Sequence, residues 1–457
     1  MKIYNSLNGQ KEEFVPIKKG SIDMYICGMT VYDDCHLGHA RTFLAFDMIV
    51  RYLRYKCFKV NYVRNITDVD DKILDKAILE NINPEALTEK FILSMQEDFI
   101  SLGMIKPDSE PRATHHIEEI INLISDLISK KFAYFEGGDV YFAVDSFPEY
   151  GKLSKRNLDD LMVGSRVEIN QNKRNPSDFV LWKKDKNDSL KWDSPWGEGR
   201  PGWHIECSAM SMKSFGDSFD IHGGGSDLKF PHHENEIAQS ESSTGKSFAN
   251  FWMHTGPLRI DDKKMSKSLG NFFTIRSVLK SYKPEVIRFF LLSSHYRSPL
   301  NYSSVKLDEA NSALERLYGS IRDIEPLENE RSEYTRRFHL AMDDDFNTPE
   351  AIAIFFDIAR QINIYKPSNM KLAQTLAGEL IKLAEPLGLL TLDPEIFYKD
   401  IKNNINITEE EILDLIDKRN EARENKNFKV ADQIRLDLDS KGILLDDTQD
   451  RTSWKKK

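Results

Sequence analysis

Three apolar segments near the N-terminus constrain the fold more than any other feature of the sequence. Residues 21–28 predict a buried strand that ends in glycine, residues 38–53 carry apolar side chains at helical spacing, and residues 59–66 predict a second strand. A strand, a helix and a strand within about fifty residues form the βαβ pattern, which predicts a parallel sheet with ligands beyond the C-terminal ends of its strands. We therefore expect an α/β fold with a nucleotide-binding site at that end of the sheet.

The pattern changes twice further along the chain. Short strands and segments rich in Trp, Gly and Pro fill residues 107–201, which we interpret as an insertion into a Rossmann-like catalytic domain of residues 1–305. Residues 306–399 show helical periodicity almost throughout, which predicts an all-helical bundle. Residues 400–457 begin with a linker and continue with a helical hairpin, so we expect a small C-terminal region there.

Composition and cysteine usage exclude several other classes of protein. No apolar run approaches the roughly 18–20 residues that a membrane span requires, and no signal-peptide pattern begins the chain, so we expect a cytoplasmic protein without a membrane partner. The formal net charge of −10 argues against coating of nucleic acid, although local basic patches still allow an RNA partner. The cysteines are too few for a disulfide framework and include no Cys-x-x-Cys pair, which excludes a zinc ribbon. They are Cys27, Cys35, Cys57 and Cys207.

Two histidines flank a glycine where the first strand gives way to the helix. Backbone amides and the helix dipole make such a place attractive to phosphate. Gly38 lets a flat base approach the backbone closely, and His36 and His39 can donate to phosphate oxygens as charge develops. Two surface histidines at a helix start explain an isolated motif of this kind equally well.

A lysine-rich loop lies far away in the sequence. Residues 262–271 read Asp-Lys-Lys-Met-Ser-Lys-Ser-Leu-Gly-Asn. Several lysines on a loop with serine and glycine suit a mobile clamp on a triphosphate and its transition state. A solvated basic loop is the ordinary alternative.

A third group of residues offers metal ligands. Cys27 ends the first predicted strand, Cys207 lies in a predicted helical segment, and Pro231 can start a helix that places His232 and Glu236 on one face. Two cysteines, a histidine and a glutamate make a reasonable zinc set, with one weak ligand leaving room for a substrate. The alternatives are a small buried cysteine and hydrogen-bonded core histidines.

The histidine pair and the lysine loop together resemble the two signatures of class I aminoacyl-tRNA synthetases. The resemblance implies that His36, His39 and Lys267, with Lys264 as a helper, stabilise the pentavalent phosphate during amino-acid activation. Leu37 replaces the isoleucine of the consensus. The implied ATP-binding residues are His36, Gly38, His39, Lys264, Met265, Ser266, Lys267 and Ser268.

Three further blocks resemble those of the cysteinyl-tRNA synthetase family within this class. They are residues 202–207 (Gly-Trp-His-Ile-Glu-Cys), 222–227 (His-Gly-Gly-Gly-Ser-Asp) and 231–236 (Pro-His-His-Glu-Asn-Glu). The resemblance implies a zinc site and a cysteine pocket. The implied zinc ligands are Cys27, Cys207, His232 and Glu236, and the implied pocket residues are Gly28, Thr67, Trp203 and His222.

The same resemblance implies the reaction and the partners. The expected substrates are L-cysteine, ATP with magnesium, and tRNA(Cys), whose terminal adenosine receives the activated cysteine; a monomer is expected. Residues 343–349 match a block of the family's anticodon-binding bundle. The C-terminal region is expected to contact tRNA through its basic residues, with Trp454 stacking on a base. Those basic residues are Lys418, Arg419, Arg423, Lys426, Lys429 and Arg435.

Three alternatives stay open. Acidic residues alternate with the C-terminal basic ones, as on any solvated helix. A ligase that transfers activated cysteine to an amino sugar would share the zinc and nucleotide blocks but would lack a full anticodon-reading tail. A non-catalytic RNA-binding protein with structural zinc would not need the signature histidines and lysines.

Overall fold

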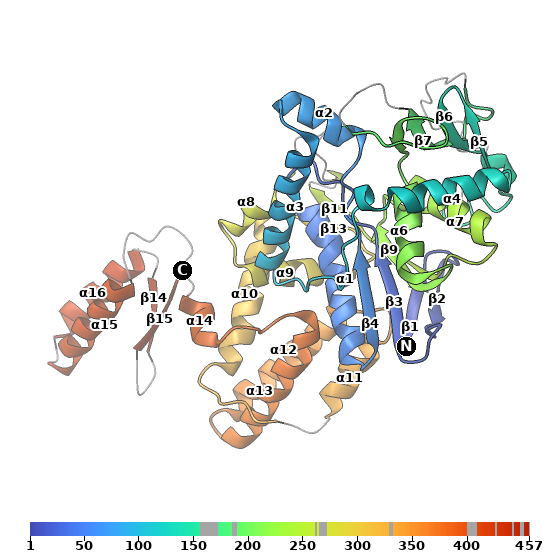
Figure 1. Ribbon diagram of the computed structural model, residues 1–457. Coiled ribbons are helices and arrows are strands. Elements are labelled where there is room, and N and C mark those ends of the chain that lie inside the picture. Colours follow the sequence, from blue (N-terminus) through green and yellow to red (C-terminus); the bar gives the residue numbers. More distant parts are fainter. Residues whose placement is uncertain are drawn as a thin grey trace.

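The computed structural model describes residues 1–155, 172–184, 190–260, 263–264, 272–328, 332–399, 409–425, 427–440, 443–447 and 452–456. In the view of Figure 1, a parallel sheet with its helices occupies the centre, a small antiparallel sheet lies above it, and a helical bundle lies below. A C-terminal unit lies beside the bundle. Among the residues described, no helix is both long and apolar enough to cross a membrane.

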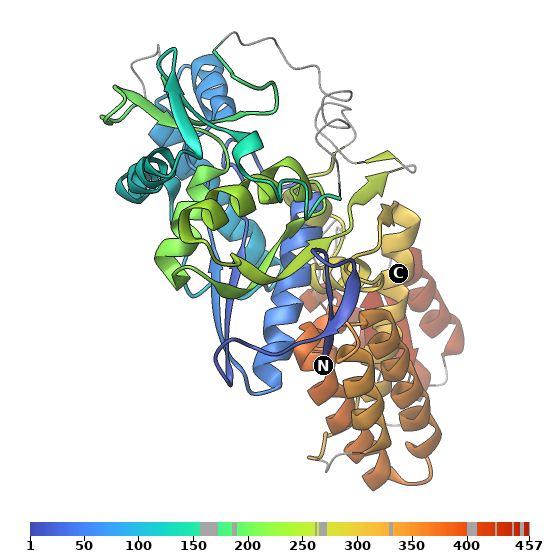
Figure 2. The same ribbon diagram turned by 90° about the vertical axis from the view of Figure 1, so that its right-hand side faces the viewer.

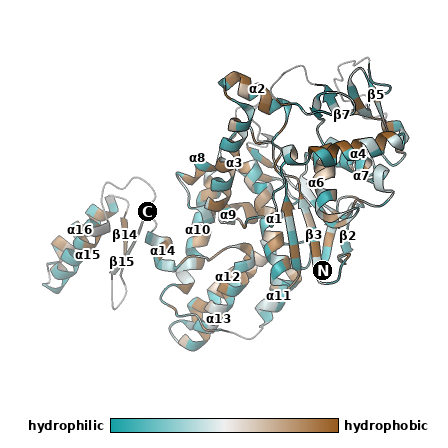
Figure 3. Cartoon of the chain, viewed as in Figure 1, coloured by the Kyte–Doolittle hydropathy of each residue, from teal (hydrophilic) through white to brown (hydrophobic). Residues whose placement is uncertain are grey.

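The central sheet confirms the predicted βαβ unit. Its strand order is β10-β9-β3-β4, and each neighbouring pair is parallel. Helix α1 connects β3 to β4 and is buried along most of its length. Strands β3 and β9 consist mostly of buried residues, as expected for a parallel sheet under helices, and Figure 3 shows hydrophobic residues in β3. The elements are β3 (Ser21–Ile26), α1 (Leu37–Tyr55), β4 (Lys59–Arg64), β9 (Phe219–Gly225) and β10 (Ala249–Thr255).

The chain between β4 and β9 includes the small antiparallel sheet that lies at the top of the molecule in Figures 1 and 2. Its antiparallel sheet has the order β5-β6-β7-β8 and falls within the segment that we interpreted as an insertion. The helices are α2 (Asp71–Glu80), α3 (Pro84–Ser101), η1 (Ala113–His115), α4 (Ile117–Ser129), η2 (Val144–Ser146) and α6 (Ile205–Phe215). The strands are β5 (Ala133–Glu136), β6 (Asp139–Phe142), β7 (Phe179–Lys184) and β8 (Gly199–Pro201).

A second small sheet lies next to the central one, in the order β12-β11-β13. Strand β11 pairs in parallel with β13 and antiparallel with β12. The elements of this part are η3 (Lys229–His233), α7 (Glu234–Thr244), β11 (Leu258–Ile260), β12 (Lys263–Lys264), α8 (Ile275–Leu279), α9 (Pro284–Leu292) and β13 (Leu300–Tyr302). An N-terminal hairpin is formed by β1 (Lys2–Asn5) and β2 (Gln10–Glu13).

The helical bundle shares one hydrophobic core with residues 1–303, which contain the parallel sheet and which we expect to be the catalytic half of the molecule. Tyr52 of α1 meets the rings of Phe338 and Phe346 from the bundle edge-on, with centroids 6.1 Å away in both cases. Apolar packing therefore joins the two parts. The bundle consists of α10 (Ser304–Ile321), α11 (Glu333–Met342), α12 (Thr348–Tyr365), α13 (Met370–Ala384), η5 (Glu385–Leu387) and α14 (Pro394–Lys399).

The C-terminal unit has a hydrophobic core of its own. It contains α15 (Glu409–Glu424), α16 (Phe428–Ser440), β14 (Ile443–Asp447) and β15 (Thr452–Lys456), and the two strands form an antiparallel hairpin. Trp454 is 3% exposed inside this core, so our expectation that it stacks on a base is wrong for this conformation. Arg419, one of the expected tRNA contacts, is also buried and donates to Thr452.

Candidate active site and metal centre

The two signature histidines cap the first turn of α1. His36 is the N-cap residue, and its Nδ1 accepts from the amides of Gly38 at 3.1 Å and His39 at 3.3 Å. The Nδ1 of His39 accepts in turn from the His36 amide at 3.3 Å, and the two rings stack with centroids 3.7 Å apart. A neutral imidazole whose Nδ1 accepts carries its proton on Nε2. Both rings are therefore prepared to donate through Nε2.

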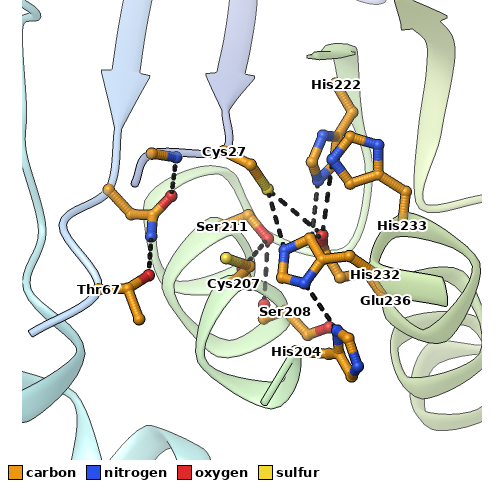
Figure 4. Close-up of polar contacts among 12 residues, drawn as sticks. Cys27, Thr67, His204, Cys207, Ser208, Ser211, His222, His232, His233 and Glu236 are labelled. Atoms are coloured by element: carbon orange, nitrogen blue, oxygen red, sulfur yellow. Dashed lines mark hydrogen bonds and ion pairs between the residues drawn. The ribbon is translucent and has the colours of Figure 1, made fainter. Parts of the chain in front are cut away.

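The ends of β3 and β4 meet at Gly28. Its amide donates to Asn65 Oδ1 at 2.8 Å, and Asn65 Nδ2 donates to Thr67 Oγ1 at 3.1 Å. A Cβ atom at position 28 would lie 1.7 Å from the Asn65 carbonyl oxygen, so only glycine fits. This chain of contacts, drawn in Figure 4, places Thr67 beside the end of β3.

A cavity of about 630 Å³ opens at this end of the sheet, where ligands bind in doubly wound α/β folds. Its size falls in the range of small-molecule sites. The predicted site residues that line it are Cys27, Gly28, His36, Gly38, His39, Thr67, Trp203, Cys207 and His232. The cavity thus brings the signature histidines, the expected amino-acid pocket and three of the four expected metal ligands together.

The four expected metal ligands come from four elements. Cys27 follows β3, Cys207 lies on α6, His232 lies in η3, and Glu236 lies on α7. One ligand atom from each lies within 4.8 Å of all the others, and all four residues are buried. His232 Nε2 lies 3.1 Å from Glu236 Oε1 and 3.4 Å from Cys27 Sγ. Figure 4 shows the four side chains converging.

The charges of the cluster fit a divalent cation. A hydrogen bond from Cys27 lowers the pKa of the Cys207 thiol to about 6, against the effect of burial, so this sulfur is anionic at neutral pH. Burial opposes ionisation of Glu236, but the His222 and His232 charges still lower the pKa of that carboxyl. Two buried anions need a compensating positive charge. Sulfur and nitrogen donors with one carboxylate suit zinc in particular.

His232 itself can supply part of this positive charge. Burial lowers the pKa of His232, but the charges of Glu236 and Cys207 overcome that effect and raise the value to about 9. Binding of a metal at Nε2 therefore displaces a proton from this ring, because a ligating imidazole must be neutral there.

A second group of four overlaps the first. Cys27, His222, His233 and Glu236 also place their ligand atoms within 4.8 Å of one another. Of these four residues, only Cys27 lines the cavity. A metal that contacts a bound substrate therefore fits the set with Cys207 and His232 better.

His222 differs from the expectation. It was expected in the cysteine pocket, but it is 0% exposed and does not line the cavity. Its Nε2 lies 2.8 Å from Glu236 Oε2, the carboxylate oxygen that faces away from His232. His222 therefore orients the candidate ligand Glu236 on the side away from the cavity.

His204 is a supporting residue to which the sequence assigned no role. Its Nδ1 lies 2.6 Å from Nδ1 of His232, which leaves Nε2 of His232 directed at the cluster. Burial, together with His232, lowers the pKa of His204 well below its usual value, so His204 is neutral and can accept the hydrogen bond. Its φ of 96° is rare for a residue with a side chain. Such strain was not visible in the sequence.

Trp203 forms a wall of the cavity beside the cluster. Its ring stacks on His204, with centroids 4.4 Å apart, and lies 5.3 Å from the ring of His232. At 47% exposure it presents a large apolar face to the cavity.

The lysine loop is described only at its start. Lys264 ends β12, where it pairs with Arg259 of β11, and the neighbouring Leu258 lines the cavity. The predicted ATP-binding residues Met265, Ser266, Lys267 and Ser268 lie outside the described residues.

Comparisons with known proteins agree with this architecture. Residues 13–312 match the family model described as the tRNA synthetases class I (C) catalytic domain, and residues 337–391 match the DALR domain. A cysteine–tRNA ligase of Hahella chejuensis is 55% identical over 468 aligned residues, which cover the whole of both chains. The corresponding ligase of Methylococcus capsulatus is 53% identical, again over the whole of both chains.

Solved structures share the fold at low sequence identity. The methionyl-tRNA synthetase of Mycobacterium tuberculosis in complex with methionyl-adenylate matches with a TM-score of 0.58 and 14% identity, covering 84% of this chain and 91% of the other. A LeuRS–tRNA–LeuAMS ternary complex of Agrobacterium radiobacter matches with a TM-score of 0.60 and 12% identity, covering 84% and 86%.

The catalytic-domain match spans most of the chain and agrees with the parallel sheet and the histidine-capped helix. The chain therefore belongs to the class I aminoacyl-tRNA synthetases, which are ATP-using enzymes. Full-length identity of 53–55% to curated relatives narrows this assignment. Within the class, the chain belongs to the family of cysteine–tRNA ligases.

Proposed function

We propose that this enzyme activates L-cysteine with ATP and transfers it to the terminal adenosine of tRNA(Cys), using one zinc ion to select cysteine. The observation that carries the proposal is the buried cluster of Cys27, Cys207, His232 and Glu236, three of whose members line the cavity at the end of the sheet.

The need to distinguish cysteine from serine explains why metal-binding residues are required. Serine differs from cysteine by one atom, and an apolar pocket separates substrates that differ by one methylene by only about 10–200-fold. When bound in the cluster, zinc supplies a Lewis acid that favours a thiolate, which forms near pH 8.5 in free cysteine, over a far more basic alkoxide. The weaker carboxylate ligand Glu236 and the open side toward the cavity leave room for the substrate sulfur.

The remaining pocket residues orient the amino acid. Trp203 excludes water from one side of the cluster and offers an apolar face to the substrate's β-carbon. Thr67 and the Gly28 backbone lie at the strand ends, where they can bind the polar main-chain groups of cysteine. We assign the cysteine pocket to these three residues and a supporting role to His222.

The signature residues act on ATP. Cysteine's carboxylate attacks the α-phosphate, and pyrophosphate leaves. The Nε2 protons of His36 and His39 are aimed by their Nδ1 caps and can donate to phosphate oxygens as charge develops. Lys267, with help from Lys264, Met265, Ser266 and Ser268, completes the ATP site in our proposal, and magnesium accompanies the nucleotide.

We assign the helical parts to tRNA. The bundle of residues 306–399 and the C-terminal unit of residues 400–457 provide helices beyond the catalytic half, and the DALR match lies in the bundle. This favours tRNA over an amino sugar as the acceptor. A monomeric state and a cytoplasmic location remain predictions from the sequence.

The test combines metal analysis with two variants. Purified enzyme should contain one zinc per chain and show cysteine-dependent ATP–pyrophosphate exchange. Cys207→Ser should lose at least about 100-fold in kcat/KM for cysteine, because it removes one ligand of a metal site. ATP binding, measured by equilibrium titration, should stay the same. Ser211→Ala is the matched control, since Ser211 lies one turn away on α6 and its hydroxyl donates to the backbone carbonyls of Cys207 and Ser208. Metal-free enzyme that still prefers cysteine to serine would refute the proposal.

A further inference from the structure

A turn of the helical bundle is joined to the catalytic half through the carboxylate of Asp345. This residue lies between α11 and α12, is fully buried and has a φ of 63°. Its Oδ1 accepts from the hydroxyl of Tyr296 at 2.8 Å, and its Oδ2 accepts from Nε of Arg297 at 2.7 Å. Both donors belong to the segment of residues 293–298, which connects α9 to β13. The bundle thus holds this connecting segment from one side.

Arg41 also holds the same segment. It lies on α1 two residues after His39 and is 1% exposed. Its guanidinium donates to the carbonyl oxygens of Leu291, Ser294 (3.4 Å), His295 (2.6 Å) and Ser298 (3.2 Å). The Leu291 carbonyl belongs to the last turn of α9, where the helix dipole favours a cation.

The connecting segment also forms the back of the cavity wall. Gly256 lines the cavity, and its amide donates to the Tyr296 carbonyl at 2.8 Å. A Cβ atom on Gly256 would lie 2.4 Å from the Ser298 backbone, so the two chains are as close as glycine allows. Strand β13 follows this segment along the chain. It pairs with β11, and β11 in turn pairs with β12. Strand β12 ends at Lys264, where the Lys-Met-Ser-Lys-Ser motif begins.

We propose that residues 293–298 form a positioning segment that sets the nucleotide end of the cavity, and that Asp345 and Arg41 are its positioning residues. The segment contacts the helix that carries His36 and His39 and supports the strands that lead to Lys264. A shift of this segment changes the distance between the histidine motif and the end of β12 at Lys264 without touching the metal cluster. The inference rests on the proposed function, because it concerns the rate of adenylate formation.

The chain offers a matched pair of variants as a test. Tyr296→Phe removes the hydroxyl that donates to Asp345 at 2.8 Å, and Tyr52→Phe removes a hydroxyl that donates to Asp343 of the same turn, also at 2.8 Å. Both tyrosines are buried, and both join the bundle to the catalytic half. Only Tyr296 belongs to the positioning segment. The two variants should therefore lose similar stability, measured as Tm, and differ in catalysis.

The expected result is a split between the two variants. In full-length enzyme, Tyr296→Phe should lower kcat of ATP–pyrophosphate exchange about fivefold, with KM for cysteine unchanged. Tyr52→Phe should retain kcat within about twofold of the wild type. Arg41→Lys, which keeps the charge but cannot reach four carbonyls, should also lower kcat and leave KM for cysteine unchanged.

Other results would have distinct meanings. Equal kcat values for Tyr296→Phe and Tyr52→Phe would overturn the positioning role. If Tyr296→Phe does not fold, Arg297→Lys replaces it in the same comparison, because Arg297 donates to the same carboxylate from a partly exposed position. Wild-type enzyme without cysteine-dependent exchange would instead refute the proposed function.

Discussion

His222 donates to the carboxylate of Glu236 through Nε2 at 2.8 Å, and both side chains are completely buried. A residue in this position fixes which oxygen of the glutamate faces the cluster. Such partners behind a ligand commonly contribute about 10–100-fold to metal affinity.

His222→Phe should therefore weaken zinc binding by about 10–100-fold while the protein stays folded. The phenyl ring can keep the stacking that His222 makes on Trp252, at a centroid distance of 4.4 Å, but it cannot donate to Glu236. Competition with a chromophoric chelator measures the affinity, and circular dichroism checks the fold. Unchanged affinity would show that His222 has no part in the metal site.

Cys207 should be the reactive thiol of metal-free enzyme. Its pKa of about 6 lies below the usual thiol value, so the thiolate fraction rises as pH increases through 6 and is nearly complete at pH 7. In a Cys57→Ser background, which removes an exposed cysteine, iodoacetamide should modify Cys207 with a midpoint near pH 6. Peptide mass spectrometry identifies the site, and added zinc should protect it. A midpoint near the ordinary value of about 8.5 would contradict the cluster's proposed charge.

Replacement of His36 should separate helix capping from catalysis. Asparagine is a good N-cap residue and alanine a poor one, so His36→Ala should lose about 1 kcal/mol of stability relative to His36→Asn. Neither variant can donate to phosphate from the position of Nε2, and both should lose about 100-fold or more in kcat of pyrophosphate exchange. Near-normal activity of His36→Asn would mean that the ring serves only as a cap.

Trp454→Ala should affect tRNA charging alone. Truncation of a buried tryptophan costs about 3–5 kcal/mol, which is enough to unfold the small core that contains Trp454. The catalytic half has a separate core. Charging of tRNA should therefore fall while pyrophosphate exchange stays at the wild-type rate. A parallel loss of both activities would show that the C-terminal unit supports the catalytic half.

The fold of the catalytic half was predictable because its signals are local. Residues 21–66 carry the strand and helix periodicities in order, and α1 starts at the histidine motif as expected. Local spacing joins His232 to Glu236, but the convergence of Cys27 and Cys207 with this pair came from resemblance, because these segments lie far apart in the sequence.

The differences from expectation concern residues whose role depends on what packs behind them. His222 belongs to a block that reaches the cavity, but its side chain points away from the cavity toward Glu236. Trp454 pairs with Leu445 across the β14–β15 hairpin and is buried there, while the sequence predicted only a helical hairpin in this region. Pairing between strands in a short, charged terminal segment has no strong periodic signal.

The hydrogen bonds to Nδ1 of His36 and His39 at the start of α1 affect the free energy of the reaction. An isolated neutral imidazole exchanges between two tautomers, with the proton on Nδ1 or on Nε2. A reaction that needs the Nε2 proton must select that tautomer. Here the backbone amides fix the Nε2 tautomer when the protein folds, so the free-energy cost of selecting that tautomer is not part of the reaction barrier. The first turn of a helix thereby determines which ring nitrogen can donate a proton to the substrate.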